Sequence, residues 1–325
     1  MQIAQIGVGY WGPNLLRNLV SNKKCKVSAV VDLSPERRDF VRGLYPAVTV
    51  TDNVDDVLND PGVEAVVIAT PVATHFDLAM RALAAGKHIF IEKPMARSVA
   101  EVDEIGRLAV QKDRVAMVGH TFLFNSAVRY VKKMIDSGDL GDIRYIYSQR
   151  LNLGKIRSDV DALWNLAPHD ISIIQYWLGD PKPLSVVRIG ADYVQEKIDD
   201  VVFMNIMYPK KIMANIHVSW LDPQKIRSMV VIGSKKMVVY DDMADEKIAI
   251  YDKGIDRKAA SGGSKQSPAF DHRSGDVLLP KIDFKEPLKV ELDHFIDCIQ
   301  NGTKCLTGVD HARTVVEILA TANVQ

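Results

Sequence analysis

Short apolar runs alternate with helix-type segments through the first 120 residues, and no other feature constrains the fold as strongly. The expected strands cover residues 3–6, 27–31, 48–50, 65–69, 89–92 and 115–118. Helical patterns lie between them, at residues 13–20, 35–44, 53–58, 74–85 and 98–110. Strands that are apolar on both faces and alternate with helices predict a parallel sheet covered on both sides. We therefore expect an α/β, doubly wound Rossmann domain over residues 1–120.

The rhythm changes after residue 120, where strand-like runs follow one another. Helices are expected at 125–137 and 169–178, and strands at 143–150, 186–193, 201–208, 212–220, 226–232, 237–240 and 248–251. Sequential strands with short turns favour antiparallel pairing. Residues 252–287 are polar and rich in Gly, Ser and Lys, so we expect an irregular excursion there, before closing helices at 288–300 and 309–322. Residues 121–325 are thus predicted to form an α+β domain on an open, mostly antiparallel sheet.

Composition excludes several classes of function. Lys and Arg together number 41, as do Asp and Glu, so no global charge favours nucleic acid or a membrane surface. No apolar stretch reaches the roughly 18 residues of a membrane span, and we expect no signal peptide. Three cysteines, without framework spacing, favour a reducing compartment. We expect a cytoplasmic protein with no nucleic-acid partner, no membrane partner and no metal in its site.

A three-glycine motif, Gly7-Val8-Gly9-Tyr10-Trp11-Gly12, follows the first expected strand and opens the first helix. In this context Gly7 permits a tight turn, Gly9 lets a pyrophosphate approach the backbone, and Gly12 lets the helix pack on the strand. The helix N-terminus offers N–H groups to the phosphates. Tyr10 and Trp11 lie inside the motif and are expected beside the cofactor.

Asp32 ends the second expected strand, about 20 residues after the glycine motif, where a carboxylate can accept both hydroxyls of a ribose. A 2′-phosphate would meet a like charge there, so the sequence favours NAD over NADP. Arg37 and Arg38 lie nearby and weaken this preference slightly. We expect both arginines on the exposed side of the helix that follows.

The end of the fourth expected strand should line the path of the cofactor. Thr70 and Pro71 close this strand at the sheet edge that holds the glycine motif. His75 opens the next helix, where it could be a functional residue or equally a capping or solvated one.

The fifth expected strand ends on a charged pair and a proline, Glu92-Lys93-Pro94. Ligands of open α/β sheets bind at the carboxyl ends of the strands, so Lys93 is expected to face the nicotinamide. Oxidation of a carbinol needs a group that removes the hydroxyl proton. A lysine could hold that oxygen, stabilise its developing charge or act as the base. Glu92 is expected to point to the opposite face and anchor cofactor or structure, and the alternative for Lys93 is a surface lysine with a partly covered stem.

A second candidate for proton transfer is His169, because histidine titrates nearest neutral pH. Pro168 suits a helix start, which would place His169 in a first turn. Asn165 lies four residues earlier and can share a face with His169 if the turn is helical. The alternative is a capping histidine whose partners are backbone groups.

These residues together resemble the Gfo/Idh/MocA oxidoreductase family over the whole chain. The resemblance rests on Gly7–Gly12, Glu92-Lys93-Pro94, the histidine helix and a closing segment at residues 286–320. It implies NAD or NADP, a sugar, inositol or nucleotide-sugar carbinol as substrate, and homodimers or homotetramers formed through the open sheet. Lys93 then corresponds to the lysine beside nicotinamide and substrate, and His169 to the acid/base histidine of the family.

Two departures from the family pattern affect these assignments. Many members place an aspartate where this chain has Asn165, and an amide cannot titrate, so Asn165 would only position the substrate. Many members also carry arginines where this chain has Thr121-Phe122-Leu123, which puts a direct transfer of substrate contacts in doubt.

Two stretches, residues 9–15 and 164–170, look like a branch found among nucleotide-sugar dehydrogenases, with UDP-N-acetylglucosamine oxidised at its 3-hydroxyl as the implied activity. Arg150, Lys155 and Arg157 precede the histidine helix and could meet the diphosphate of such a substrate, or form a solvated basic loop. The alternatives are an inositol or free-monosaccharide dehydrogenase, a redox-neutral enzyme that keeps its NAD, and a catalytically silent NAD-binding sensor or regulator.

Overall fold

The computed structural model describes residues 1–258 and 269–322, which form two compact units. The first unit contains Met1–Phe124 together with Lys285–Ala320, and the second is built on Asn125–Phe284. The division of functions between residues 1–120 and 121–325 stays a prediction. In its packing, the closing segment Lys285–Ala320 belongs to the first unit.

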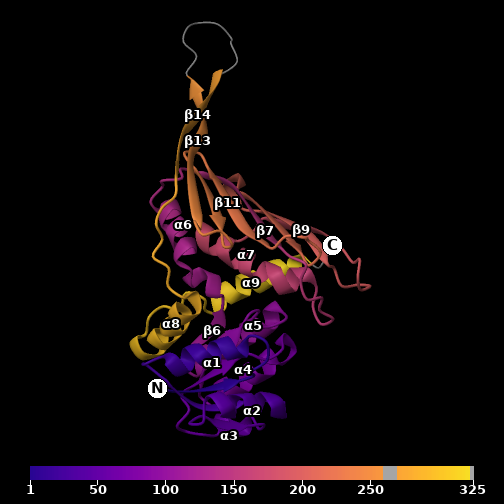
Figure 1. Cartoon of the computed structure of the whole chain (residues 1–325), viewed down its shortest axis with the longest axis vertical. Coiled ribbons are helices and arrows are strands. Elements are labelled where there is room, and N and C mark those ends of the chain that lie inside the picture. Colours follow the sequence, from indigo (N-terminus) through magenta and orange to yellow (C-terminus); the bar gives the residue numbers. More distant parts are fainter. Residues whose placement is uncertain (259–268, 323–325) are drawn as a thin grey trace. The chain divides into compact units, whose positions relative to one another are not determined.

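The first unit is a six-stranded sheet in the order β3-β2-β1-β4-β5-β6, with all neighbouring strands parallel. Helices α1 to α5 surround it in the indigo and purple part of Figure 1. This confirms the predicted doubly wound fold, and the order reverses between β1 and β4. The strands are β1 (Gln2–Ile6), β2 (Lys26–Val31), β3 (Thr49–Thr51), β4 (Ala65–Ile68), β5 (His88–Glu92) and β6 (Ala116–Gly119), and the helices are α1 (Gly12–Ser21), α2 (Pro35–Leu44), α3 (Asp55–Leu58), α4 (His75–Ala84) and α5 (Val99–Gln111).

Two closing helices, α8 (Pro287–Asn301) and α9 (Val309–Thr321), complete the first unit. The ring of Phe295 on α8 packs edge-on against Phe90 of β5, with centroids 5.7 Å apart. The segment between the helices also continues the sheet, since the Val118 N–H donates to the Thr307 carbonyl at 2.9 Å. Chain that is distant in sequence therefore supports β5 and β6, the strands that end in the candidate site.

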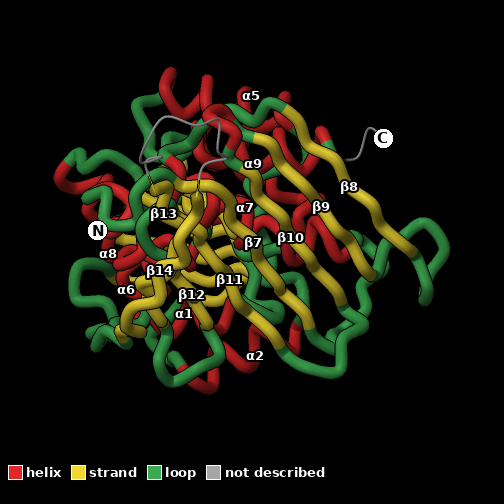
Figure 2. Tube along the Cα trace, turned by 90° about the horizontal axis from the view of Figure 1, so that it is seen from above, coloured by secondary structure: helices red, strands yellow, loops and turns green. Residues whose placement is uncertain are grey.

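The second unit is an eight-stranded sheet in the order β14-β13-β12-β11-β7-β10-β9-β8, seen side by side in Figure 2. The predicted open, mostly antiparallel sheet is confirmed, with one parallel pair between β7 and β10. Helices α6 and α7 pack on it. No helix in the described ranges has the length and apolarity that crossing a bilayer requires. The elements are α6 (Ser126–Asp136), β7 (Ile143–Leu151), α7 (Ala162–Leu178), β8 (Ser185–Ala191), β9 (Val201–Met207), β10 (Met213–Ser219), β11 (Ile226–Gly233), β12 (Met237–Asp241), β13 (Ile248–Lys258) and β14 (Ala269–Leu278).

The irregular excursion predicted for residues 252–287 is wrong over much of its described length. The chain instead forms the paired strands β13 and β14, which reach beyond the other strands of their sheet in Figure 1. Ladder hydrogen bonds need no apolar alternation, and Arg273 links the strands through Asp252 and Asp256 at 3.0 and 2.9 Å. The polar composition of this segment therefore led to the prediction of irregular structure where the chain forms a β-hairpin. Residues 259–268 of that prediction lie outside the described part of the chain.

Candidate active site

The glycine motif begins directly after β1, and its three glycines meet different surroundings. Gly7 has a φ of +93°, and a Cβ on it would lie 2.6 Å from the Ala69 carbonyl oxygen. A Cβ on Gly12 would lie 2.6 Å from the Gly7 carbonyl oxygen. A Cβ on Gly9 would meet no atom of the described chain within 4 Å. The protein itself thus requires two glycines, whereas the space over Gly9 fits the close approach of a pyrophosphate.

Gln5 of β1 fixes the conformation of this loop through two hydrogen bonds. Its side chain is fully buried, and its Nε2 donates to the carbonyl oxygens of Gly7 and Gly12, both at 2.9 Å. Gln5 was not predicted as a site residue, although a polar residue inside an apolar strand is the signal that could have identified it. The loop is therefore held in shape by protein contacts alone.

The N-terminus of α1 fits an anionic ligand. Trp11 is the N-cap residue and provides no side-chain cap, and the first turn carries no acidic side chain. Early N–H groups of a helix have no intrahelical partner and carry a partial positive charge. Tyr10 is 94% exposed and Trp11 is also exposed, and their predicted contact with the cofactor stays a prediction.

Asp32 follows β2, and each of its carboxylate oxygens accepts a backbone hydrogen bond. The Val8 N–H donates to Oδ2 at 2.7 Å and the Ser34 N–H donates to Oδ1 at 2.9 Å. These bonds join the glycine motif to the end of β2. The Asp32 side chain is accordingly held at the place where the sequence predicts recognition of a ribose.

The prediction for the two neighbouring arginines is half right. Arg37 is exposed as predicted. Arg38 is not: its side chain is only 14% exposed and donates to the carbonyl oxygens of Asp32 and Leu33 at 2.8 and 2.9 Å. The guanidinium lies against the end of β2 because it donates to these carbonyls. The prediction considered only the position of Arg38 on the helix, so it placed the side chain in solvent.

His75 joins the ends of two strands. It is buried, with Nδ1 2.9 Å from the Pro94 carbonyl oxygen and Nε2 2.9 Å from the Thr70 carbonyl oxygen. Burial lowers the pKa of His75, the two carbonyls oppose this, and the charge of Lys93 lowers it further. The ring therefore ties the Thr70-Pro71 segment after β4 to the segment after β5, which neither a capping nor a solvated histidine would do.

Replacing His75 by Leu should destabilise the protein by about 1–3 kcal/mol, because the carbonyl that accepts the ring N–H loses its partner and the contact between the two strand ends is lost. The same change at His272, an exposed position on β14, should leave stability within about 0.5 kcal/mol. Chemical unfolding of both variants measures the difference, and equal stabilities would remove this role for His75.

Glu92 and Lys93 stand at the carboxyl end of β5, both partly buried. The Lys93 N–H donates to Glu92 Oε2 at 3.3 Å. Burial raises the pKa of Glu92 to about 7, against the opposing effects of the Lys93 charge, this backbone bond and a hydrogen bond from Trp11. Because Trp11 belongs to the glycine motif, Glu92 connects that motif with the Lys93 strand end.

A second carboxyl group lies near Glu92, and sequence reasoning missed it. Glu291 on α8 is fully buried, and its Oε2 accepts a 2.6 Å hydrogen bond from Thr121. Burial raises its pKa well above the usual value, and the charge of Glu92 adds to this effect. The two carboxyl groups come from distant parts of the chain, so no local motif could have revealed them.

His120 follows β6 and stacks edge-on with His311 of α9, with ring centroids 5.4 Å apart. Burial, then His311 and the charge of Lys93, lower the pKa of His120 well below its usual value. A neutral imidazole is therefore expected in the neighbourhood of Lys93 at neutral pH. His120 was not among the predicted site residues.

The contribution of Glu92 to stability should fall as the pH rises from about 4.5 to about 7, because folded Glu92 keeps its proton in this window while the unfolded chain loses it. The decline attributable to Glu92 is at most about 3 kcal/mol. In Glu92→Gln, a permanently neutral side chain should remove most of it. Urea unfolding across this pH range measures the slope, with Glu104→Gln, an exposed position on α5, as control. Identical slopes in wild type and Glu92→Gln would contradict the elevated pKa.

In the second unit, Asn165 and His169 both lie on α7, which corrects one prediction. The helix begins at Ala162 rather than near Pro168, with the Asp161 side chain accepting from the Trp164 N–H at 2.8 Å. Pro168 is therefore inside the helix, and His169 is not in a first turn. Asp161 is the stronger start signal because it supplies the cap that Pro168 cannot. Asn165 and His169 lie four residues apart on α7, so the helical turn that a shared face requires is present.

The three basic residues predicted to meet a diphosphate have different surroundings. Arg150 is 5% exposed and its Nε donates to Asp170 at 2.6 Å. Arg157 is partly exposed and donates to Asp159 through Nε at 2.8 Å and Nη2 at 2.6 Å. Lys155 is exposed. Arg150 thus belongs to a buried ion pair, whereas the other two lie nearer the solvent.

The predicted site residues therefore fall into two groups. The first unit brings together the glycine motif, Asp32, His75, Glu92 and Lys93 through the contacts given above. The second unit carries His169, Asn165 and the basic residues. The pairing of Lys93 with His169 stays a prediction.

Comparison with known proteins assigns both parts of the chain to domains of one family. Residues 1–120 match the oxidoreductase family with an NAD-binding Rossmann fold, GFO_IDH_MocA, and residues 128–239 match the GFO/IDH/MocA C-terminal domain. One relative is the 2,7-anhydro-N-acetylneuraminate hydratase of Mediterraneibacter gnavus, 28% identical over 63% of this chain. That match spans only 58% of the hydratase.

Two further relatives match over nearly their whole length. The scyllo-inositol 2-dehydrogenase (NAD(+)) of Bacillus subtilis is 27% identical over 95% of this chain and 90% of its own. The UDP-N-acetylglucosamine 3-dehydrogenase of Acidithiobacillus ferrooxidans is 27% identical over 98% of this chain and 97% of its own. A solved structure of the latter is similar in fold, with a TM-score of 0.81 and 24% identity over 100% of this chain and 96% of that one. The chain belongs to the GFO/IDH/MocA oxidoreductase family.

Proposed function

We propose that this chain is an NAD-dependent oxidoreductase that transfers hydride between nicotinamide and a sugar carbinol. The observation that carries the proposal is the linkage of Lys93 to the glycine motif. Glu92 hydrogen-bonds with Trp11 of that motif and with the Lys93 backbone. The lysine thus stands on the strand end that is tied to the loop suited to a dinucleotide.

The cofactor proposed is NAD, which would supply the hydride acceptor when bound. Gly9 leaves room for its pyrophosphate and Asp32 presents acceptors for ribose hydroxyls. Arg38 lies against the end of β2, so NADP should be tested beside NAD. Asp32 nevertheless opposes a 2′-phosphate through its like charge.

In this mechanism the neutral amine form of Lys93 holds the substrate hydroxyl and receives its proton as the carbinol is oxidised. His169 is the proposed partner in proton transfer, and Asn165, which cannot titrate, positions the substrate. Lys93 therefore carries more of the proton chemistry than it would if a carboxylate stood at position 165.

The substrate proposed is a nucleotide-sugar, such as UDP-N-acetylglucosamine oxidised at its 3-hydroxyl. The full-length similarity to a UDP-N-acetylglucosamine 3-dehydrogenase supports this. Lys155 and Arg157 are the proposed contacts of the diphosphate, since they are less buried than Arg150. An inositol is the second candidate, because a scyllo-inositol 2-dehydrogenase matches over a similar length.

A redox-neutral reaction is a candidate of another kind. The similarity to a 2,7-anhydro-N-acetylneuraminate hydratase supports this candidate, because a hydration is not a net oxidation. Such an enzyme would retain its NAD through purification and release no NADH.

We also propose a homodimer or homotetramer formed through the open sheet of the second unit.

Thermal unfolding with NAD or NADP and a panel of UDP-sugars, free sugars and inositols tests the substrate class. The true class should stabilise the protein by about 2.7 kcal/mol at a hundredfold excess over its dissociation constant. UDP alone serves as the control for diphosphate binding. Stabilisation by inositols and not by UDP-sugars would overturn the nucleotide-sugar assignment, and NAD binding without any response to the panel would favour a sensor.

A further inference from the structure

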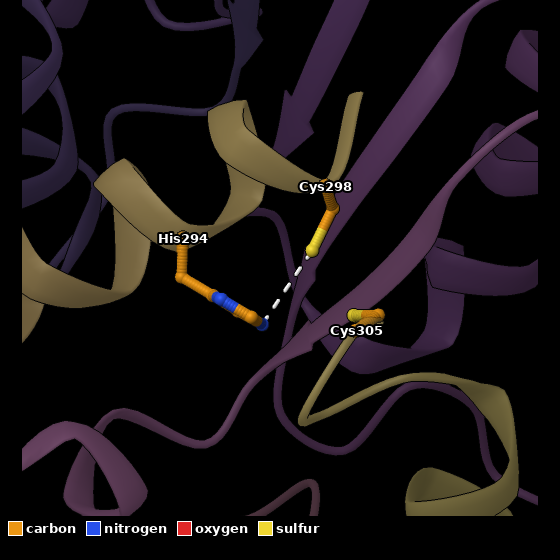
Figure 3. Close-up of side chains that lie close together, drawn as sticks. All are labelled: His294, Cys298 and Cys305. Atoms are coloured by element: carbon orange, nitrogen blue, oxygen red, sulfur yellow. Dashed lines mark hydrogen bonds between the residues drawn. The ribbon is translucent and has the colours of Figure 1, made fainter. Parts of the chain in front are cut away.

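Three potential metal-binding side chains of the first unit point toward one another (Figure 3). His294 and Cys298 lie one turn apart on α8, and Cys305 lies in the segment that leads to α9. A ring nitrogen of His294 and the two Sγ atoms all lie within 4.8 Å of one another. Cys298 is 4% exposed and the other two residues are partly buried. The proposed hydride-transfer chemistry uses none of them.

The spacing of these atoms suits a tetrahedral ion with nitrogen and sulfur ligands. Zinc binds Cys sulfur at about 2.3 Å and His nitrogen at about 2.0–2.1 Å, which places S and N about 3.5 Å apart on a tetrahedral edge. Cys298 Sγ lies 3.5 Å from His294 Nε2. Two thiolates select zinc over magnesium or calcium, which prefer oxygen ligands.

Local contacts orient the imidazole for this task. The Leu306 N–H donates to His294 Nε2 at 3.0 Å, so this nitrogen is an acceptor with a lone pair that could bind a metal ion. The ring of Phe124 packs against the imidazole, with centroids 5.4 Å apart. Metal binding would exchange the single bond from Leu306 for a bond to the ion, with the ring already turned toward the two sulfurs.

We propose that His294, Cys298 and Cys305 bind one Zn²⁺ ion, with a water molecule in the fourth position. The ion would fasten the segment between α8 and α9 to α8. That segment supports β6, through the bond from the Val118 N–H to the Thr307 carbonyl and the bridge between Met117 and Gly308. The site is thus a structural link beneath the strand that leads to His120, separate from hydride transfer.

Zinc titration of the metal-free, full-length protein under a phosphine reductant tests this site, with a chromophoric chelator as competitor. We expect one Zn²⁺ per chain, and at least a hundredfold weaker binding in Cys298→Ser and in Cys305→Ser. Cys25→Ser is the matched control, because the Cys25 Sγ lies near the Leu19 carbonyl, at 3.5 Å, and not in the cluster. Co²⁺ in place of Zn²⁺ should give thiolate-to-metal charge-transfer absorbance that both cluster variants lose.

Circular dichroism shows whether each variant is folded, and His294→Gln provides a third ligand variant if either serine variant is not. The absence of zinc binding by the reduced wild type would overturn the proposal. Unchanged affinity in the folded cluster variants would do the same. A disulfide between Cys298 and Cys305 under mild oxidation, in a protein that binds no zinc when reduced, would identify a redox pair instead.

Discussion

Lys93→Met should lower kcat by about 10²–10⁴-fold, the usual contribution of a positioned proton-transfer group, while NAD affinity changes little. Methionine keeps much of the length of the side chain but can neither hold the substrate oxygen nor accept its proton. The cofactor contacts proposed at the glycine motif and Asp32 remain. Steady-state kinetics and calorimetric NAD titration separate the two effects.

Lys93→Arg distinguishes the roles that a lysine can play at this position. Arginine keeps the positive charge but does not release its proton in proteins. If Lys93 accepts the proton, Lys93→Arg should be nearly as slow as Lys93→Met. Activity close to wild type in Lys93→Arg would show that the charge alone is needed. Lys112→Met, at an exposed position after α5, is the control and should keep full activity.

Gly9→Val should abolish detectable NAD binding, a loss of at least about a hundredfold, without unfolding the protein. Its Cβ would meet no described atom of the chain within 4 Å, so stability should change by less than about 1 kcal/mol. The added methyl groups would occupy the space proposed for the pyrophosphate. NAD titration and thermal unfolding of the same variant measure both quantities.

Two other glycines make this prediction specific. Gly12→Val should lose stability as well as NAD binding, because its Cβ would lie 2.6 Å from the Gly7 carbonyl oxygen. Gly43→Val, on α2 and also with open space around its Cβ, should keep NAD binding. If Gly9→Val binds NAD like the wild type, the dinucleotide does not lie over this loop.

The fold of the first unit was largely predictable because each strand carries its own signal. Continuous apolar runs and glycine or proline boundaries locate β1 and β5 to within one residue, as 3–6 against Gln2–Ile6 and 89–92 against His88–Glu92. The hairpin of β13 and β14 escaped prediction because its strands pair through backbone bonds and ion pairs rather than an apolar face. The start of α7 was misplaced because Pro168, a frequent first-turn residue, lies inside the helix.

The candidate site was predictable where it rests on local motifs and not where it depends on tertiary contacts. The glycine motif and the Glu92-Lys93-Pro94 tripeptide are each contiguous in sequence. Each follows a predictable parallel strand, so their positions at the carboxyl edge of the sheet could be predicted. Glu291 and the cluster of His294, Cys298 and Cys305 come from the closing segment, and only packing on β5 and β6 reveals their neighbours.

The most direct test of hydride transfer follows a deuterium label placed on C3 of UDP-N-acetylglucosamine. With NAD and the wild-type chain, we expect NADH absorbance to appear and the deuterium to be found in the reduced nicotinamide by mass spectrometry. Neither should occur with Lys93→Met. If the sugar binds but keeps its deuterium, and no NADH forms, the chain is not a dehydrogenase acting on this carbinol.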